Sequence, residues 1–379
     1  MSSPDPIDRA MQSAVETGVF PGAVLLVRVR GRSVCHRAFG CAALLPQREP
    51  ALLNTLYDLA SLTKPLATAT AVLWLIQETR LSLDTFLDDV LTELKGSAIG
   101  RATVEHLLSH SSGLPGWRPF YERIAEQDRA QPGFLGSDAA RDLTLHLIRD
   151  EPLSGPVGAQ SQYSDLGFML LGFAVERVAG CSLAVLCGER IYDPVGAGPL
   201  FFIGRHGNPV GGAKGRPVDL ALVAPTEDHA WRGQILRAEV HDENAYALGG
   251  VAGHAGLFGT ADAVLTMSGC WLNSYLGRES VLRPELVRRF VSRQKGPADS
   301  SWALGWDTPS APSSSGTRFS PASFGHLGYT GTSVWIDPVA ELEVVLLTNR
   351  IHPTRTNEKI REFRPLIHDT IYEELVAKG

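Results

Sequence analysis

Residues 61–80 read SLTKPLATATAVLWLIQETR. Apolar residues recur in this stretch at helical spacing, which predicts a helix with one buried face. They are Leu62, Leu66, Ala69, Leu73 and Ile76. Pro65 restricts where the helix begins, because proline is tolerated only in or near a first turn. Ser61 is therefore expected at the helix start, where its backbone N–H has no partner within the helix.

Ser61 and Lys64 are three residues apart, which places both side chains on one face of a helix. A serine hydroxyl is a weak nucleophile until a neighbouring base takes its proton, and Lys64 is within reach to do so. The free N–H of Ser61 and the helix dipole would both favour negative charge on a carbonyl oxygen. The alternative is a solvated serine and lysine at an ordinary helix start, because this short pattern often arises by chance.

A second candidate is Tyr163-Ser164-Asp165, which precedes an apolar segment. A lysine beside Tyr163 would lower the pKa of its phenol, and the phenolate could then act as a base toward Ser61. Asp165 is placed to cap the following helix. A plain capping turn with a packed tyrosine is the alternative.

A third candidate is His326-Leu327-Gly328, just before a β-rich run at 332–336. Neighbouring glycines would let this backbone lie close to a substrate. The N–H of Tyr329 could then be a second oxyanion donor, and His326 could hold a leaving group or a carboxylate. A glycine-rich hairpin with an incidental histidine is the alternative.

These three motifs, in this order and at these distances, resemble those of the serine β-lactamase and penicillin-binding protein superfamily. The likeness is greatest to its class C β-lactamase-like branch, which includes family VIII esterases and D-amino-acid peptidases. Longer stretches carry the same resemblance: TVEHLLSHSSGLPGW at 103–117, GGVAGHAGLF at 249–258 and FGHLGYTGTSVWIDP at 324–338. The resemblance covers nearly the whole chain and implies an α+β fold of the β-lactamase/transpeptidase type.

The resemblance implies a role for each matching residue. Ser61 attacks a carbonyl and is acylated, Lys64 and Tyr163 share the work of the base, and the N–H groups of Ser61 and Tyr329 form the oxyanion hole. Substrate-binding positions are expected at Asp165, His326, Gly328 and His254. For His254 a turn histidine bonded to backbone is an equal alternative.

Two positions depart from the family pattern. The second motif usually ends in Asn, whereas Asp165 stands here, and a carboxylate cannot donate to an amide carbonyl. The third motif of true β-lactamases usually begins with Lys, whereas His326 stands here, and a neutral imidazole holds a carboxylate less firmly. We therefore expect a hydrolase of a small ester or amide, such as an esterase or D-alanyl peptidase, more than a β-lactamase. The alternative is a penicillin-binding or sensing protein with little turnover.

The order of elements predicts how the chain is arranged. A helix at 6–17 and strands at 23–29 and 33–39 begin it, and strands at 332–336 and 342–347 and a helix at 357–377 end it. Terminal strands need partners, so we expect one antiparallel sheet built from both ends and flanked by helices. Residues 1–60 and 246–379 would form this lobe. Residues 61–245 would form an inserted, mainly helical lobe, with the site in the cleft between them.

The middle of the chain divides into helices and irregular stretches. Helices are expected at 103–109, 137–149, 165–179, 182–191, 261–275 and 283–294. Residues 199–245 look irregular, and 307–323, rich in Ser and Pro, reads as a surface loop.

Composition excludes several classes of protein. The 379 residues are 44% hydrophobic and 20% charged, which is ordinary for a globular protein. The net charge of −6 comes from charges mixed along the chain, so nucleic acid is not an expected partner. Five cysteines without a C-x-x-C pair suggest reduced thiols. The N-terminus does not resemble a signal peptide, and the apolar run at 67–76 is too short to span a bilayer, so we expect a cytoplasmic protein.

His106 and His110, four residues apart, could share a metal ion. Leu107 stands where the zinc-protease motif needs Glu, and a third ligand is not evident. Packed and capping roles are expected instead, with neither a metal nor a cofactor. The chain also has no G-x-S-x-G motif, which argues against an α/β-hydrolase.

Overall fold

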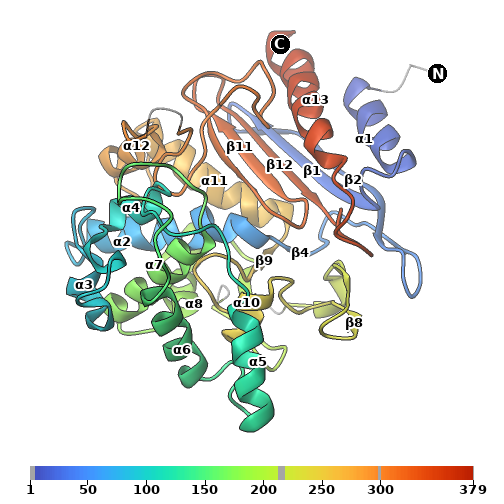
Figure 1. Ribbon diagram of the computed structural model, residues 1–379. Coiled ribbons are helices and arrows are strands. Elements are labelled where there is room, and N and C mark those ends of the chain that lie inside the picture. Colours follow the sequence, from blue (N-terminus) through green and yellow to red (C-terminus); the bar gives the residue numbers. More distant parts are fainter. Residues whose placement is uncertain (1–4, 212–217, 298–299, 379) are drawn as a thin grey trace.

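The computed structural model describes residues 5–211, 218–297 and 300–378 (Figure 1). A six-stranded antiparallel sheet joins the two ends of the chain, as the order of elements predicted. Its strands, in spatial order, are β10 (Phe324–Leu327), β11 (Ser333–Asp337), β12 (Leu342–Thr348), β1 (Gly22–Val29), β2 (Arg32–Ala43) and β3 (Glu49–Pro50). Strand β1 pairs with β12 from Ala23 opposite Thr348 to Val29 opposite Leu342.

Both faces of this sheet are covered, because residues along each strand point alternately to one side and the other. Leu25 and Val27 pack under α1 (Pro6–Glu16) and α13 (Ile360–Tyr372), while Val24 and Leu26 join the larger core on the opposite face. Helix α11 (Ala261–Tyr275) covers that opposite face, and α12 (Pro284–Val291) packs beside it (Figure 1).

A buried ion pair ties α11 to the sheet. Arg28 of β1 donates through Nε and Nη2 to the two oxygens of Glu343 on β12, at 2.6 and 2.8 Å. Ser268 of α11 donates to the same carboxylate at 2.8 Å. Glu343 is 1% exposed, so its charge depends on these partners.

The middle of the chain is mainly helical (Figure 1). Its helices are α2 (Thr70–Gln77), α3 (Leu87–Val90), α4 (Val104–Leu108), α5 (Phe120–Ala130), α6 (Asp138–Arg149), α7 (Asp165–Ala179), α8 (Leu183–Cys187), α9 (Asp193–Val195) and α10 (Glu243–Ala247). The expected helix at 165–179 is confirmed to the residue: Ser164 caps its start, and Gly180 at φ +74° ends it. The division into two lobes with these boundaries stays a prediction.

The stretch 199–245, expected to be irregular, contains short strands. A second sheet has the order β4 (Tyr57–Asp58), β9 (Leu257–Gly259), β5 (Leu200–Ile203) and β6 (Pro209–Val210). A hairpin follows, made of β7 (Asp228–His229) and β8 (Gln234–Ile235). Strands of two to four residues are too short to show an alternating pattern in a sequence.

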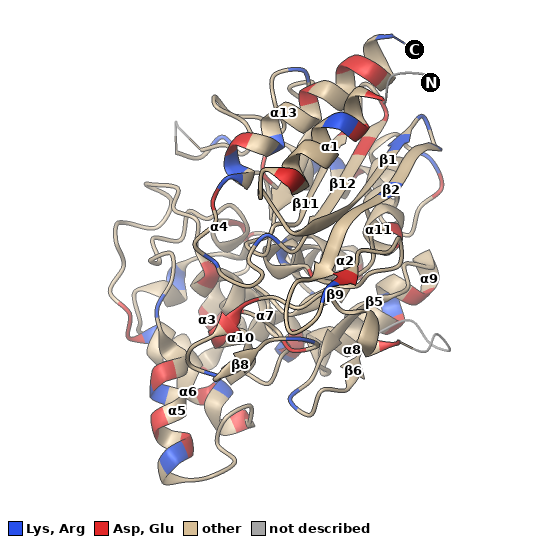
Figure 2. Ribbon diagram, turned by 90° about the vertical axis from the view of Figure 1, so that its right-hand side faces the viewer, with Lys and Arg blue, Asp and Glu red and all other residues tan. Residues whose placement is uncertain are grey.

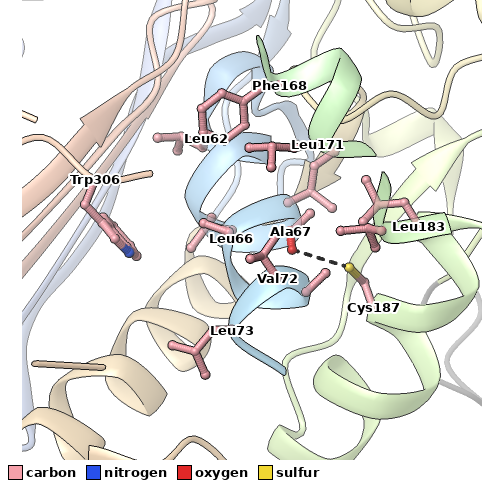
Figure 3. Close-up of a cluster of buried hydrophobic side chains, with 14 of the residues drawn as sticks. Leu62, Leu66, Ala67, Val72, Leu73, Phe168, Leu171, Leu183, Cys187 and Trp306 are labelled. Carbon is pink, nitrogen blue, oxygen red and sulfur yellow. Dashed lines mark hydrogen bonds between the residues drawn. The ribbon is translucent and has the colours of Figure 1, made fainter. Parts of the chain in front are cut away.

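The segment that begins with Ser61 crosses the centre of the helical part. It consists of a 3₁₀ turn at Ala60–Leu62, a π-helical stretch at Lys64–Ala69 and helix α2, where one regular helix was expected. Figure 3 shows its apolar side chains packed against α7 and α8, with Trp306 on the other side. Lys64 is 0% exposed within this core, so the packing that buries the helix also buries a charge.

Lys and Arg are interspersed with Asp and Glu along the chain, on helices and loops alike (Figure 2). Among the described residues, no single helix is long and apolar enough to cross a membrane. Two helical segments, Asp165–Ala179 and Leu183–Val195, are long and apolar enough only when taken together, and the chain bends by 71° between them. Both segments contribute side chains to the large internal core.

Replacing Glu343 by Ala should destabilise the protein by about 3 kcal/mol, because Arg28 and Ser268 lose a buried partner. The free energy of unfolding in urea measures this. Glu358→Ala, which breaks an exposed pair with Arg361, is the matched control and should change stability by less than about 0.5 kcal/mol. Equal effects of the two substitutions would show that the buried pair does not hold α11 to the sheet.

Candidate active site

A cavity of about 410 Å³ opens beside Ser61. The residues that line it come from segments far apart in the sequence: Ala60, Ser61, Trp117, Tyr163, Asp165, His241, Asp242, Glu243, His254, Ala255, Tyr329 and Arg355. Five positions expected from the sequence are therefore brought together here, namely Ser61, Tyr163, Asp165, His254 and Tyr329. Lys64 lies directly behind them.

Lys64 contacts the candidate nucleophile. Its Nζ lies 3.0 Å from Ser61 Oγ, 2.7 Å from Asp165 Oδ1 and 3.1 Å from the carbonyl oxygen of His254. The carboxylate and the carbonyl can only accept, so two N–H groups of Lys64 are committed to them. The remaining position on nitrogen faces Ser61. It is an N–H when Lys64 is charged and a lone pair, able to take the hydroxyl proton, when Lys64 is neutral.

The surroundings of Lys64 favour its charged form. Burial alone would lower the pKa of its amine, but the charge of Asp165, the neighbouring Tyr163 and the hydrogen bond to Asp165 outweigh burial and raise it above the ordinary value. Asp165 thus stabilises the ammonium form.

Tyr163 lies over the same lysine. Lys64 Nζ is 4.8 Å from the centroid of its ring. Burial raises the pKa of Tyr163, and the positive charge of Lys64 offsets only part of that effect. Tyr163 and Lys64 therefore both keep their protons at neutral pH.

The backbone before Ser61 has a strained conformation. Ala60 has φ +47°, a region that non-glycine residues seldom adopt. Two hydrogen bonds hold it: Ala60 N–H donates to Asp58 Oδ1 at 2.8 Å, and Thr63 Oγ1 donates to the Ala60 carbonyl at 2.6 Å. This turn leads the chain into the helix with the Ser61 side chain on the cavity.

The segments that carry the two expected oxyanion donors are joined directly. Thr330 Oγ1 donates to the Asp58 carbonyl at 2.7 Å, and Thr332 Oγ1 donates to the Leu59 carbonyl at 3.1 Å. Within the described chain, the backbone N–H groups of Ser61 and Tyr329 donate no hydrogen bond to another residue. Both remain available to a substrate oxygen.

Gly328 permits this close approach. A Cβ at Gly328 would lie 2.6 Å from the Leu59 carbonyl and 2.0 Å from Thr332 Oγ1, so only glycine fits. The sequence indicated that this glycine lets backbone lie close to a substrate. In the structure it lets the Tyr329 turn lie close to the segment before Ser61.

A network of hydrogen bonds among acidic groups, histidines and an arginine adjoins the cavity. His254 Nε2 lies 2.8 Å from Asp242 Oδ1, and His241 Nε2 lies 3.0 Å from Glu227 Oε2. Arg355 bridges Glu227 and Glu243 through Nη2. His254 lines the cavity, its ring bonds a carboxylate and no backbone group, and its carbonyl accepts from Lys64. Its contact with a substrate stays a prediction.

His326 lies outside the residues that line the cavity. It is 2% exposed, its ring centroid lies 6.1 Å from that of Tyr163, and Nδ1 lies 2.8 Å from the Leu327 carbonyl. Burial and the charge of Lys64 lower its pKa to about 3, so the imidazole is neutral. Direct contact between His326 and a substrate stays a prediction, and this placement favours a role in supporting Tyr163.

The two histidines considered as metal ligands have local structural roles. His106 forms a capping box with Thr103 at the start of α4. His110 Nδ1 accepts from Ser164 N–H at 3.1 Å, and its ring lies 4.6 Å from that of Tyr163. The expected packed and capping roles are confirmed. His110 also holds the backbone of the second motif in place at Ser164.

Sequence reasoning missed Asp58, Asp242, Glu243 and Arg355. Asp58 precedes Ser61 by three residues, but nothing in the sequence shows that its second oxygen accepts from His241 N–H at 2.7 Å. Arg355 meets Glu227 across 128 positions of chain. Such contacts between distant segments leave no local pattern.

Comparison with known proteins agrees with this geometry. The family model described as Beta-lactamase matches residues 7–368. A protein of Escherichia coli strain K12 named "Putative D-alanyl-D-alanine carboxypeptidase" is 34% identical over 374 residues, covering 91% of this chain and 82% of its own. The esterase structure "EstCE1, a hydrolase with promiscuous acyltransferase activity" has a TM-score of 0.72 at 23% identity and covers 97% of each chain. The octameric penicillin-binding protein homologue from Pyrococcus abyssi has a TM-score of 0.71 at 20% identity, over 98% of this chain and 77% of its own.

Fold and site together define a serine hydrolase that acts through an acyl-enzyme. The chain belongs to the Beta-lactamase family, and its fold is the β-lactamase/transpeptidase-like fold that the sequence motifs predicted.

Asp58→Asn should lower kcat about 100-fold with little change in KM, because an amide cannot accept from both Ala60 N–H and His241 N–H. Adding Ala60→Gly should recover part of the loss, since glycine adopts a positive φ without support. Ester turnover and the melting temperature are measured for parent, single and double variants. If turnover falls only as far as the lower melting temperature explains, and Ala60→Gly recovers none of it, Asp58 does not hold the Ser61 turn in place.

The rate should rise with pH into the alkaline range, because the proton of the Lys64–Tyr163 pair must leave before Ser61 can give up its own. Asp165→Asn removes the charge that raises the pKa of Lys64, so the acid limb should move to lower pH. A profile of kcat/KM from pH 6 to 10 tests both statements. An acid limb that is unchanged in Asp165→Asn would be inconsistent with them.

Proposed function

We propose that Ser61 is the nucleophile of this hydrolase, that Lys64 and Tyr163 form its base, and that the N–H groups of Ser61 and Tyr329 bind the oxyanion. The contact of 3.0 Å between Lys64 Nζ and Ser61 Oγ is the observation that carries this proposal. Ser61 lines the cavity, and this contact joins it to Lys64, the other polar residue of its sequence motif.

The reaction has two steps. Ser61 Oγ bonds to the substrate carbonyl carbon while its proton passes to the Lys64–Tyr163 pair, and the leaving group departs with a proton from that pair. Water then attacks the acyl-serine while the same pair takes a proton from it, and the pair returns this proton to Oγ as the bond between Oγ and the acyl carbon breaks. His254 O and Asp165 keep Lys64 in place in both steps.

The size of the cavity suits a small acyl donor. Its volume of about 410 Å³ lies at the lower end of the range for ligand pockets. The aromatic rings of Trp117, Tyr163 and Tyr329 line it beside charged groups. We propose a small ester or amide as substrate, and the carboxypeptidase name of the relatives adds D-alanyl peptides as one class to test.

A second candidate function is acylation without rapid turnover, as in a penicillin-binding or sensing protein. Asp165 and the buried His326 favour it, because the second motif of this family usually ends in Asn and the third motif of true β-lactamases usually begins with Lys. Release of product from nitrocefin at a steady rate would exclude this alternative. A stable adduct on Ser61 would support it.

A fluorescent phosphonate and a 4-nitrophenyl ester test the proposed function. Parent protein should be labelled on Ser61 and should hydrolyse the ester. Ser61→Ala should lose labelling and at least about 1,000-fold in turnover. Ser310→Ala, an exposed serine on the 307–323 loop, serves as the control and should match the parent. Equal labelling of Ser61→Ala and parent would overturn the assignment of the nucleophile.

A further inference from the structure

A buried arginine of α13 contacts the turn that carries the expected oxyanion donor Tyr329. Arg364 is 6% exposed. Its Nη2 donates to the carbonyl oxygens of Thr332 at 2.9 Å and of Gly328 at 3.3 Å, so it joins the two ends of the turn at 328–332. The C=O of Gly328 and the N–H of Tyr329 belong to one peptide group. The guanidinium therefore contacts the same peptide group whose N–H is expected to bind the substrate oxygen.

The two polar ends of that peptide group point in opposite directions, because the peptide bond is trans. The C=O of Gly328 faces the guanidinium, while the N–H of Tyr329 donates to no other residue of the described chain. A cation at the carbonyl oxygen polarises the whole peptide group, and hydrogen bonds in a chain strengthen one another in this way. The charge of Arg364 thus makes the Tyr329 N–H a stronger donor without touching the substrate.

The turn does not need Arg364 to complete its own hydrogen bonds. The Gly328 carbonyl also accepts from Gly331 N–H at 3.1 Å, and the Thr332 carbonyl also accepts from Gly328 N–H at 2.7 Å. Both oxygens would keep a main-chain donor if the guanidinium were removed. Within the described chain, Nε of Arg364 is buried without a hydrogen-bond partner. The arginine therefore brings a buried charge that the stability of the turn does not explain.

No carboxylate of the described residues pairs with this charge. The printed acceptors of Arg364 are main-chain carbonyl oxygens, and burial, followed by the charge of Arg350, lowers its pKa. The other buried cation of the site differs, because Lys64 is paired with Asp165 at 2.7 Å. Lys64 and Asp165 largely cancel each other, whereas the positive charge of Arg364 is left to act on the peptide group in front of it.

A second buried arginine holds the next peptide group of the same turn. Arg350 is 7% exposed, and its Nε and Nη2 donate to the Tyr329 carbonyl at 3.0 and 2.6 Å. Among surface charges near Arg350, Glu358 favours its charged form and Arg361 opposes it. Arg361 and Glu358 pair with each other at 2.9 Å, so they contribute little net charge. The side of the turn away from the cavity is therefore positive.

We propose that Arg364 is a positioning residue of the oxyanion hole, whose charge polarises the Gly328–Tyr329 peptide group and strengthens the Tyr329 N–H toward the developing oxyanion. This inference rests on the proposed function, because it needs the Tyr329 N–H to bind the oxyanion formed by attack of Ser61. Arg364 does not line the cavity. It acts through the peptide group, and it neither gives nor takes a proton during the reaction.

Arg364→Met tests the proposal, because methionine fills much of the same space without a charge. The kcat for a 4-nitrophenyl ester should fall about 10-fold, less than the 100- to 1,000-fold that follows loss of a whole oxyanion donor. KM should change by less than about twofold, because the effect appears only as charge develops in the transition state. Phenylboronic acid, which forms a tetrahedral adduct on a serine, should bind about 10-fold more weakly.

The melting temperature should not fall with the activity. In Arg364→Met it should equal or exceed that of the parent, because both turn carbonyls keep main-chain donors and a buried charge is removed. Arg364→Lys keeps the charge, so it should retain more kcat than Arg364→Met while being less stable. Arg288→Met is the matched control, since Arg288 is exposed on α12 and donates to the Tyr275 carbonyl at 2.9 Å. It should keep the parental kcat.

Three outcomes would overturn the inference. They are a parental kcat in Arg364→Met, a kcat in Arg364→Met equal to or above that of Arg364→Lys, and equal weakening of ester and boronic acid binding. The last outcome would show that the turn has only loosened, and it can be read even from a variant of lower stability. In each case phosphonate labelling of Ser61 in the parent shows that the proposed nucleophile stands. Loss of labelling in the parent would overturn the proposed function, and this inference with it.

Discussion

The structure depends on one buried cation. Lys64 is fully buried, and Ser61, Asp165 and the His254 carbonyl surround its amine. A buried charge is costly unless it is paired and hydrogen-bonded, so these three partners must stay in place for the fold to persist. They come from three separate segments of the chain. The interaction that prepares the nucleophile is therefore the same one that holds those segments together.

The surrounding elements keep this arrangement rigid. Short strands, the Asp58 carboxylate and the threonines at 330 and 332 tie the Ser61 turn to the Tyr329 turn and to the loop at 241–243. The six-stranded sheet fixes the Tyr329 turn through β10 and β11. A strained Ala60 survives there because the surroundings determine its conformation more than its own preference does. Tertiary contacts therefore set the positions of the two N–H groups that are expected to bind the oxyanion.

Much of this could be predicted from local sequence, and the reasons are physical. Helices α7 and α11 have strong caps in Ser164 and Thr260, and their expected bounds match the structure. The terminal strands alternate or are apolar throughout, so the sheet followed from pairing rules. The π-helical stretch after Lys64 and the two-residue strands had no pattern to reveal them. The burial of His326 could not be predicted either, because Tyr163 and Trp302, whose rings pack against it, come from distant parts of the chain.

The central claim is that Asp165 holds Lys64 charged beside Ser61. It accounts for the alkaline pH dependence expected of the rate. An NMR titration of ¹³Cε-labelled lysines, with Lys64 assigned by comparison with Lys64→Arg, measures its protonation directly. Exposed lysines titrate with pKa values of about 10.4. The account predicts that Lys64 is still charged at the pH where they begin to titrate, and that the pKa of Lys64 falls in Asp165→Asn. A Lys64 that is already neutral at pH 7 would contradict it.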